Sequence, residues 1–109
     1  MLTDQEFERR AGDAIEALYK TLAEAAEQWE FDVEVNSGAL TVEFESPRER
    51  FVVSPNAPVS QIWVSALVHS YKLDWDAAHG AFILASSGQT LTELMQASIA
   101  QRLPGFELQ

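Results

Sequence analysis

The sequence predicts an α+β domain, a two-layer sandwich in which two helices cover one face of an antiparallel sheet. Apolar residues recur with the helical period of 3.6 near both ends of the 109-residue chain. Between these segments, short apolar–polar alternations are separated by connections of hairpin length, which join antiparallel strands. We therefore expect one helix, six short strands and a second helix, in that order, within a single domain over residues 1–109.

The first helix is expected to start at Thr3 or Asp4, because residues 3–6 have the form of a capping box. Apolar residues then recur at spacings of three and four and form one core-facing stripe. The stripe consists of Phe7, Ala11, Ile15, Leu18, Leu22, Ala25 or Ala26, and Trp29. The opposite face is mostly acidic and carries Glu6, Asp13, Glu16, Lys20, Glu24 and Glu27.

After Trp29 the period changes from 3.6 to 2, which predicts a β-hairpin over residues 31–36 and 40–45. Ser37 and Gly38 are expected to form its turn. Counting back from that turn places Asp32 opposite Glu43, a like-charge pair that costs a few tenths of a kcal/mol or more.

Four further strands are expected at residues 51–53, 61–65, 70–75 and 81–84, the first of them after a short turn around Pro47. Residues 54–58 are expected to form a loop, because their two prolines cannot donate hydrogen bonds to a sheet. The second helix is expected to be capped by Thr90 with Glu93 and to end at Pro104. Its apolar stripe is Leu91, Leu94, Met95, Ser98, Ile99 and Leu103.

Composition excludes several classes of function. The chain has no cysteine, so it offers no disulfide, thiolate metal ligand or cysteine nucleophile. A formal net charge of −10 disfavours binding to nucleic acids and anionic membranes, which attract cationic proteins. There is no apolar stretch of about 20 residues and no positively charged signal region. We expect a cytoplasmic protein with cationic partners; a mitochondrial location would require a transit peptide that has been removed.

The sequence contains few signs of catalysis. It has no Gly-rich phosphate loop, no nucleophile elbow and no His-x-x-x-His pair. His69 and His79 fall in different predicted turns, and no acidic partner for a triad is evident. The carboxylates lie on predicted outer faces, where nothing separates their pKa values into an acid and a base. We therefore do not expect a conventional enzyme.

The excess negative charge is concentrated in residues 1–45, which hold 12 acidic and 3 basic residues, against 5 and 4 in the remainder. A solvated helix face explains part of this pattern. However, compensating lysines are largely absent from the helix, and the same charge continues into the hairpin. Oxygen ligands without His or Cys suit hard cations, and an exposed ridge would bind them weakly.

Trp63 is a candidate contact for a protein partner. If Ile62 and Val64 face the core, Trp63 and Gln61 lie on the uncovered face of the sheet, where an exposed tryptophan is a candidate hot spot. Periodicity alone leaves the reverse arrangement open, with Trp63 in the core.

Residues 58–65 contain Gln61-Ile62-Trp63 after a proline, which is similar to the most specific signature of the frataxin family. The hairpin at residues 32–42 and the helix start at residues 87–94 also resemble that family, and the resemblance to its bacterial CyaY-like branch covers essentially the whole chain. It implies a role in iron–sulfur cluster assembly, with iron (Fe²⁺ or Fe³⁺) bound weakly and other hard cations able to substitute. It also implies a monomer, with iron-dependent oligomers as an alternative, whose partners are a cysteine desulfurase and the scaffold protein.

The resemblance also assigns residues to two surfaces. Iron would be bound by an acidic ridge made of Asp4, Glu8, Asp13, Glu16, Glu24, Glu27, Glu30, Asp32 and Glu34. The partner-facing sheet would use Asn56, Gln61, Ile62 and Trp63. The ridge is thinner than in many members of the family, since Lys20, Ala23, Ala26 and Gln28 stand where acids are common. Two alternatives remain, namely ferroxidase or iron-storage activity at the ridge and an acidic interaction module that needs no metal.

Overall fold

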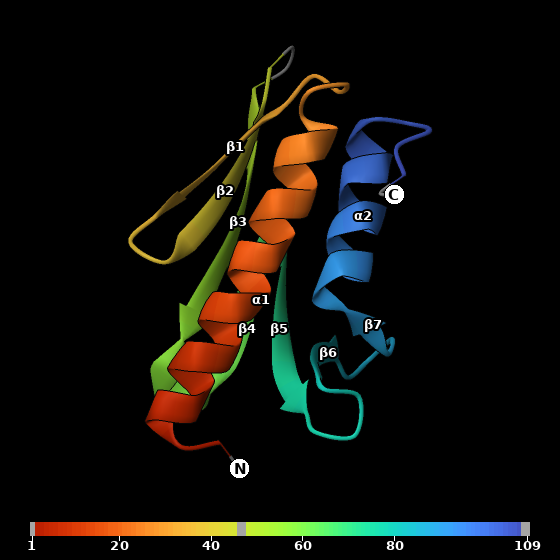
Figure 1. Ribbon diagram of the computed structural model, residues 1–109. Coiled ribbons are helices and arrows are strands. Elements are labelled where there is room, and N and C mark those ends of the chain that lie inside the picture. Colours follow the sequence, from red (N-terminus) through yellow and green to blue (C-terminus); the bar gives the residue numbers. More distant parts are fainter. Residues whose placement is uncertain (1, 46–47, 108–109) are drawn as a thin grey trace.

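The computed structural model describes residues 2–45 and 48–107, and the predicted turn around Pro47 lies outside them. Two helices lie side by side on one face of a single antiparallel sheet (Figure 1), as the sequence predicted. The strands follow chain order from β1 to β7 across the sheet. The elements are α1(Asp4–Ala25), β1(Asp32–Asn36), β2(Ala39–Phe44), β3(Glu49–Asn56), the short 3₁₀ helix η1(Ala57–Val59), β4(Gln61–Ala66), β5(His69–Asp76), β6(Ala81–Leu84), β7(Gln89–Thr90) and α2(Leu91–Arg102).

Helix α1 begins as predicted, with the Thr3 hydroxyl accepting a hydrogen bond from the Glu6 N–H at 3.1 Å. Its core-facing stripe is buried from Phe7 to Leu22. The helix ends at Ala25, earlier than the apolar stripe indicated. Trp29 lies in the turns that follow and is half-buried, with its ring 5.2 Å from that of Phe106. The last position of the predicted stripe therefore contributes to packing without being helical.

The core lies between the helices and the inward face of the sheet. Alternate residues of β2 are buried, as their alternation predicted, and in β4 the buried set is Ile62, Val64 and Ala66, which periodicity alone had left open; Met95 and Ile99 of α2 belong to the same core. Thr90 and Glu93 form the expected capping box at the start of α2. Near its end, Arg102 Nη2 donates to the Glu45 carbonyl at 3.1 Å, which connects the helix to the region after β2.

Two predictions about the strands were wrong. The segment containing Pro55 is part of β3, and Pro55 lies opposite Ile62 of β4. The described pairing with β2 stops at Val53, so at Pro55 the strand has one neighbour only and its missing N–H can face the open side. The sheet also has a seventh strand, the two-residue β7, which is too short to produce an alternating pattern.

The predicted register of the first hairpin is confirmed, with Asp32 opposite Glu43. The structure also shows how the like-charge pair is tolerated. Arg50 lies opposite Glu43 on the other side, in β3, and its Nη2 is 2.9 Å from the Glu43 Oε1. Strand β2 therefore places one carboxylate between an acid and a base.

Candidate functional site

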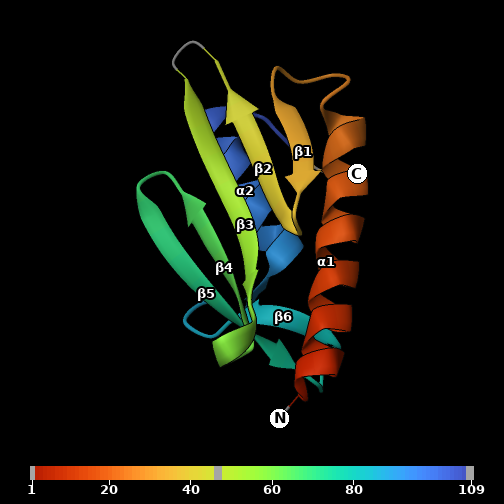
Figure 2. The same cartoon turned by 90° about the vertical axis from the view of Figure 1, so that its left-hand side faces the viewer.

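The nine acidic residues that the sequence singled out, which we call the acidic ridge, are all exposed to solvent. Five of them lie on the outward face of helix α1, namely Asp4, Glu8, Asp13, Glu16 and Glu24. The turns after Ala25 add Glu27 and Glu30, and β1 adds Asp32 and Glu34. Figure 2 shows β1 alongside α1, and the two elements are in contact, so the two parts of the ridge are neighbours.

The carboxylates of the ridge are spread out. Within the described part of the chain, Lys20 is the only cation paired with the ridge, 3.4 Å from Glu16, and both side chains are largely exposed. The same part of the chain contains no group of three or more His, Cys, Asp or Glu residues placed to hold one metal ion. The ridge can attract hard cations to several weak sites, because its donors are oxygens in open solvent.

Sequence reasoning did not assign Glu43 and Glu45 to the site. Both line a hollow of about 460 Å³ near the end of α1, together with the ridge residues Glu30 and Asp32. Glu43 is only half-exposed and is paired with Arg50. The continued acidic charge of the hairpin was visible in the sequence, but its position beside the turns after α1 required the fold.

A second surface lies on the uncovered face of the sheet, where Trp63 is 38% exposed while Ile62 and Val64 are buried. The Trp63 indole N–H donates to the Gln61 Oε1 at 3.0 Å. The Gln61 Nε2 in turn donates to the Asp74 Oδ1, also at 3.0 Å. These contacts fix the orientation of an exposed aromatic ring, which lowers the entropy that a partner must remove on binding.

The structure places the other predicted contact residues differently. Asn56 lies at the end of β3, directly opposite Gln61, so these two residues meet on the same surface. The side chain of Ile62 has 0% exposure and packs in the core. Lys72 and Asp74 of β5 complete the surface, opposite Trp63 and Gln61 respectively, and sequence reasoning missed both. We call Asn56, Gln61, Trp63, Lys72 and Asp74 the tryptophan surface.

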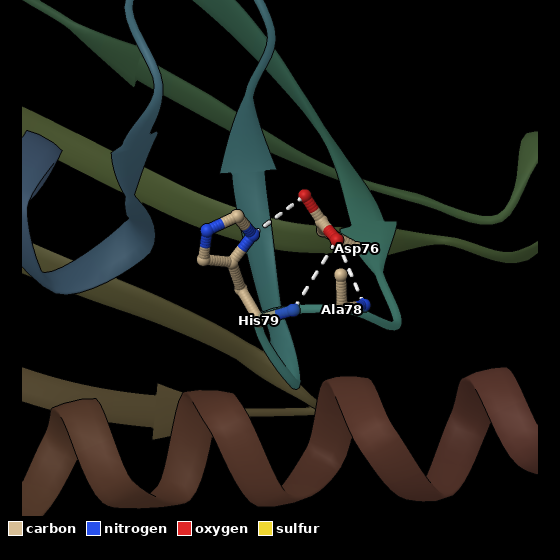
Figure 3. A network of polar contacts seen from close by, with 3 residues as sticks. All are labelled: Asp76, Ala78 and His79. Atoms are coloured by element: carbon tan, nitrogen blue, oxygen red, sulfur yellow. Dashed lines mark hydrogen bonds and ion pairs between the residues drawn. The ribbon is translucent and has the colours of Figure 1, made fainter.

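His79, for which no acidic partner was evident in the sequence, has one in Asp76 (Figure 3). The ring Nδ1 lies 2.9 Å from the Asp76 Oδ2, and the N–H groups of Ala78 and His79 donate to the Asp76 Oδ1 at 2.9 and 3.3 Å. The hydrogen bond from the His79 side chain is the main cause that lowers the pKa of Asp76. The prediction that His69 lies in a turn was wrong, because His69 is the first residue of β5. The Asp76–His79 pair is exposed and stabilises the β5–β6 turn.

Comparison with known proteins identifies the family. The sequence profile of the frataxin-like domain matches residues 1–105. The chain belongs to the frataxin family. The iron-sulfur cluster assembly protein CyaY of Azotobacter vinelandii is 30% identical to this frataxin over 90 residues, which cover 81% of each chain.

The fold of this frataxin is similar to the solved structure of frataxin from Psychromonas ingrahamii, described as a model for the CyaY protein family. The TM-score is 0.81 at 22% sequence identity, and the match covers 94% of this chain and 92% of the other. The described residues of this frataxin contain no helix that is long and apolar enough to cross a membrane.

Proposed function

We propose that this frataxin is a cytoplasmic iron-binding protein that regulates iron–sulfur cluster assembly and donates iron to it, acting as a monomer on a cysteine desulfurase–scaffold complex. The observation that carries the proposal is the exposed Trp63 beside Gln61 in a chain of the frataxin family. The name of the Azotobacter vinelandii relative, an iron-sulfur cluster assembly protein, supports the same function.

In this proposal the acidic ridge has two roles. Its negative field concentrates Fe²⁺ at the surface, and the nine exposed carboxylates supply the oxygen ligands that hard cations prefer. The same field steers the protein towards a basic surface of the desulfurase, an effect that weakens as salt screens the charges. Iron is cargo here, bound weakly at several positions.

The tryptophan surface provides the close contact with the scaffold protein. Tryptophan is over-represented among interface residues whose truncation costs about 2 kcal/mol or more. Trp63 suits this role because its ring is exposed and already held by Gln61 and Asp74. Asn56 lies beside Gln61 and adds an amide group at the edge of the contact.

The test is a reconstituted cluster-assembly reaction with a desulfurase, its scaffold and Fe²⁺, with and without this frataxin. Trp63→Ala is expected to weaken binding to the complex about 30-fold, as a loss of about 2 kcal/mol implies, and to remove the effect on assembly rate. Val68→Ala is the matched control, since Val68 is fully exposed in the turn between β4, which carries Trp63, and β5. Unchanged regulation by Trp63→Ala would refute the docking role.

The open placement of the ridge carboxylates also favours a second candidate, an acidic interaction module that needs no metal. Carboxylates spread over a helix face suit a broad basic protein surface as well as they suit iron. The two candidates differ in one measurement. If bound iron is required for docking, a chelator abolishes the binding of this frataxin to the desulfurase complex, whereas a metal-free module binds equally well with and without the chelator.

A further inference from the structure

Strand β1 has a free edge. It is the first strand in the order of the sheet, and the strand pairing of the described residues leaves its outer side open. Ser37 and Gly38 both have positive φ and form the two-residue turn that joins β1 to β2. Hydrogen-bonded pairs alternate along such a hairpin starting from the pair next to the turn, Asn36 and Ala39. The backbone N–H and C=O groups of Val33 and Val35 therefore point away from β2, towards the open side.

A groove runs beside this edge. Helix α1 packs over the inward face of the hairpin (Figure 2), and a hollow of about 320 Å³ remains between them. Val35, on the same face as Val33, is 41% exposed there. A Cβ atom built on Gly12 would meet no atom of a neighbouring element within 4 Å, so the hollow is open at this position. The hollow is lined by Gly12, Ile15, Glu16, Tyr19, Val35 and Gly38.

The edge and the groove together have the shape that an additional strand would fill. Such a strand would pair with the free groups of Val33 and Val35. Its alternate side chains would then enter the groove beneath α1, because neighbouring residues on paired strands share a face. An apolar side chain fits that position, since Ile15, Tyr19 and Val35 supply the groove's side-chain walls.

The acidic side chains around this edge indicate which kind of added strand would bind there. Asp32 and Glu34 are exposed on the opposite face of β1, and Glu16 lines the groove. Opposite charges directly across a strand pair attract and like charges repel. A second copy of this chain would bring its own Asp32 and Glu34 to the pair, so charge disfavours it. Lysine or arginine residues at the outward positions are complementary.

We propose that the free edge of β1 accepts an extended basic segment of a partner protein as an eighth strand. The segment alternates apolar residues, which enter the groove beside α1, with lysine or arginine residues, which lie next to Asp32 and Glu34. This site is separate from the tryptophan surface and needs no metal.

The test uses the iron-free full chain labelled with ¹⁵N and a synthetic eight-residue peptide of alternating lysine and valine. Added peptide is expected to slow hydrogen exchange of the Val33 and Val35 amides at least tenfold. The amides of Asp32, Glu34 and Asn36, which already face β2, should change much less. The alternating glutamate–valine peptide and a lysine–valine peptide with central prolines are the matched controls, and neither is expected to bind.

Two variants sharpen the test. Val35→Pro removes an N–H that points away from β2, so the hairpin is preserved while one bond to the added strand is lost. We expect peptide affinity to fall about tenfold, with the amide spectrum of the rest of the chain unchanged. If Val35→Pro does not fold, Glu34→Lys serves instead, and it should weaken the lysine peptide and strengthen the glutamate peptide.

Three results would overturn the proposal. The first is unchanged exchange at Val33 and Val35 at millimolar peptide, and the second is peptide-induced change around Trp63 instead. The third is protection of Val33 and Val35 that grows with protein concentration in the absence of peptide, which would show a second copy at the edge. Because the experiment contains no iron, its failure leaves the proposed role in cluster assembly intact.

Discussion

Lys72 lies directly opposite Trp63 in the β4–β5 pair, with its Nζ 5.1 Å from the centre of the indole ring. A cation over an exposed aromatic face stabilises the pair by about 0.5–1 kcal/mol. The Asp74–Gln61–Trp63 hydrogen bonds hold the same ring from its edge. The exposed tryptophan is therefore fixed by residues of two strands before any partner arrives.

Asp74→Ala tests this arrangement. Without the carboxylate, Gln61 loses its acceptor and no longer holds the indole N–H in one orientation. We expect a weaker effect on cluster assembly and a stability change of no more than about 0.5 kcal/mol, because the site is on the surface. The measurement is the NMR relaxation of the Trp63 indole N–H, which should report increased motion on the picosecond–nanosecond timescale.

Asp74→Asn is the matched control, since its amide oxygen can still accept from Gln61. An indole signal that stays equally rigid in the alanine variant would show that Lys72 or the strand alone orients Trp63.

The charge of the acidic ridge predicts a dependence of stability on salt. Residues 1–45 contain twelve acidic and three basic residues. The mutual repulsion of the excess carboxylates destabilises the folded state. Raising the ionic strength from about 0.01 M to 0.15 M shortens the screening length from about 30 Å to about 8 Å. We expect a higher melting temperature at the higher salt and, by preferential binding, with added divalent cations. Circular dichroism melts that coincide under all these conditions would contradict the prediction.

The β4–β5 turn contains stored backbone strain. Leu67 and Val68 have φ values of 52° and 59°, in the left-handed region that a β-branched residue rarely adopts. Val68 is fully exposed, so its side chain contributes no packing. We expect Val68→Gly to raise the free energy of unfolding by about 1 kcal/mol and the melting temperature by about 4–8 °C. Urea unfolding measures the first quantity, and a less stable variant would show that the valine is not strained.

This turn also explains what the sequence could not predict about the tryptophan surface. Two-residue hairpin turns are recognised by asparagine or glycine, and Leu67-Val68 contains neither. Without that signal the register of β4 and β5 could not be counted, so Lys72 and Asp74 were not placed opposite Trp63 and Gln61. In the first hairpin, Ser37-Gly38 supplied the signal, and the predicted pairing of Asp32 with Glu43 was right.

Periodicity predicted the elements that are long enough to repeat, including α1, the hairpins and α2. It failed where a single contact decides the structure. Pro55 is tolerated in β3 because the described pairing with β2 stops at Val53, so no neighbouring strand on that side needs a donor N–H from Pro55. Strand β7 is defined only by two residues that pair with β6. The exposure of the ridge residues in α1 followed from the helical period, and that of Asp32 and Glu34 followed from the two-residue period of the first hairpin, whereas the Asp76–His79 contact depended on the conformation of a turn.

The lowered pKa of Asp76 predicts that the stability of the fold depends on pH. The hydrogen bond from His79 lowers the pKa of Asp76 in the folded state, so the unfolded state binds its proton at a higher pH. The resulting stabilisation is complete above the ordinary carboxyl pKa of about 3.9 and is lost as pH falls through the lowered value. Asp76→Asn keeps an oxygen for the turn N–H groups but removes the charge. We expect the variant to be less stable at pH 6 and the difference to shrink towards pH 3.

Urea unfolding at a series of pH values between 3 and 6 measures that difference. A gap between the two proteins that is the same at every pH would show that the Asp76 charge contributes nothing to the β5–β6 turn.

The most direct test of the proposed function is an anaerobic Fe²⁺ titration followed by amide NMR. Paramagnetic iron broadens the signals of nearby residues, so the position of the ion is measured along the chain. The account predicts broadening confined to residues 4–34 and their neighbours Glu43 and Glu45, with Trp63 unaffected. Sharp signals throughout at millimolar iron, or broadening centred on the tryptophan surface, would contradict it.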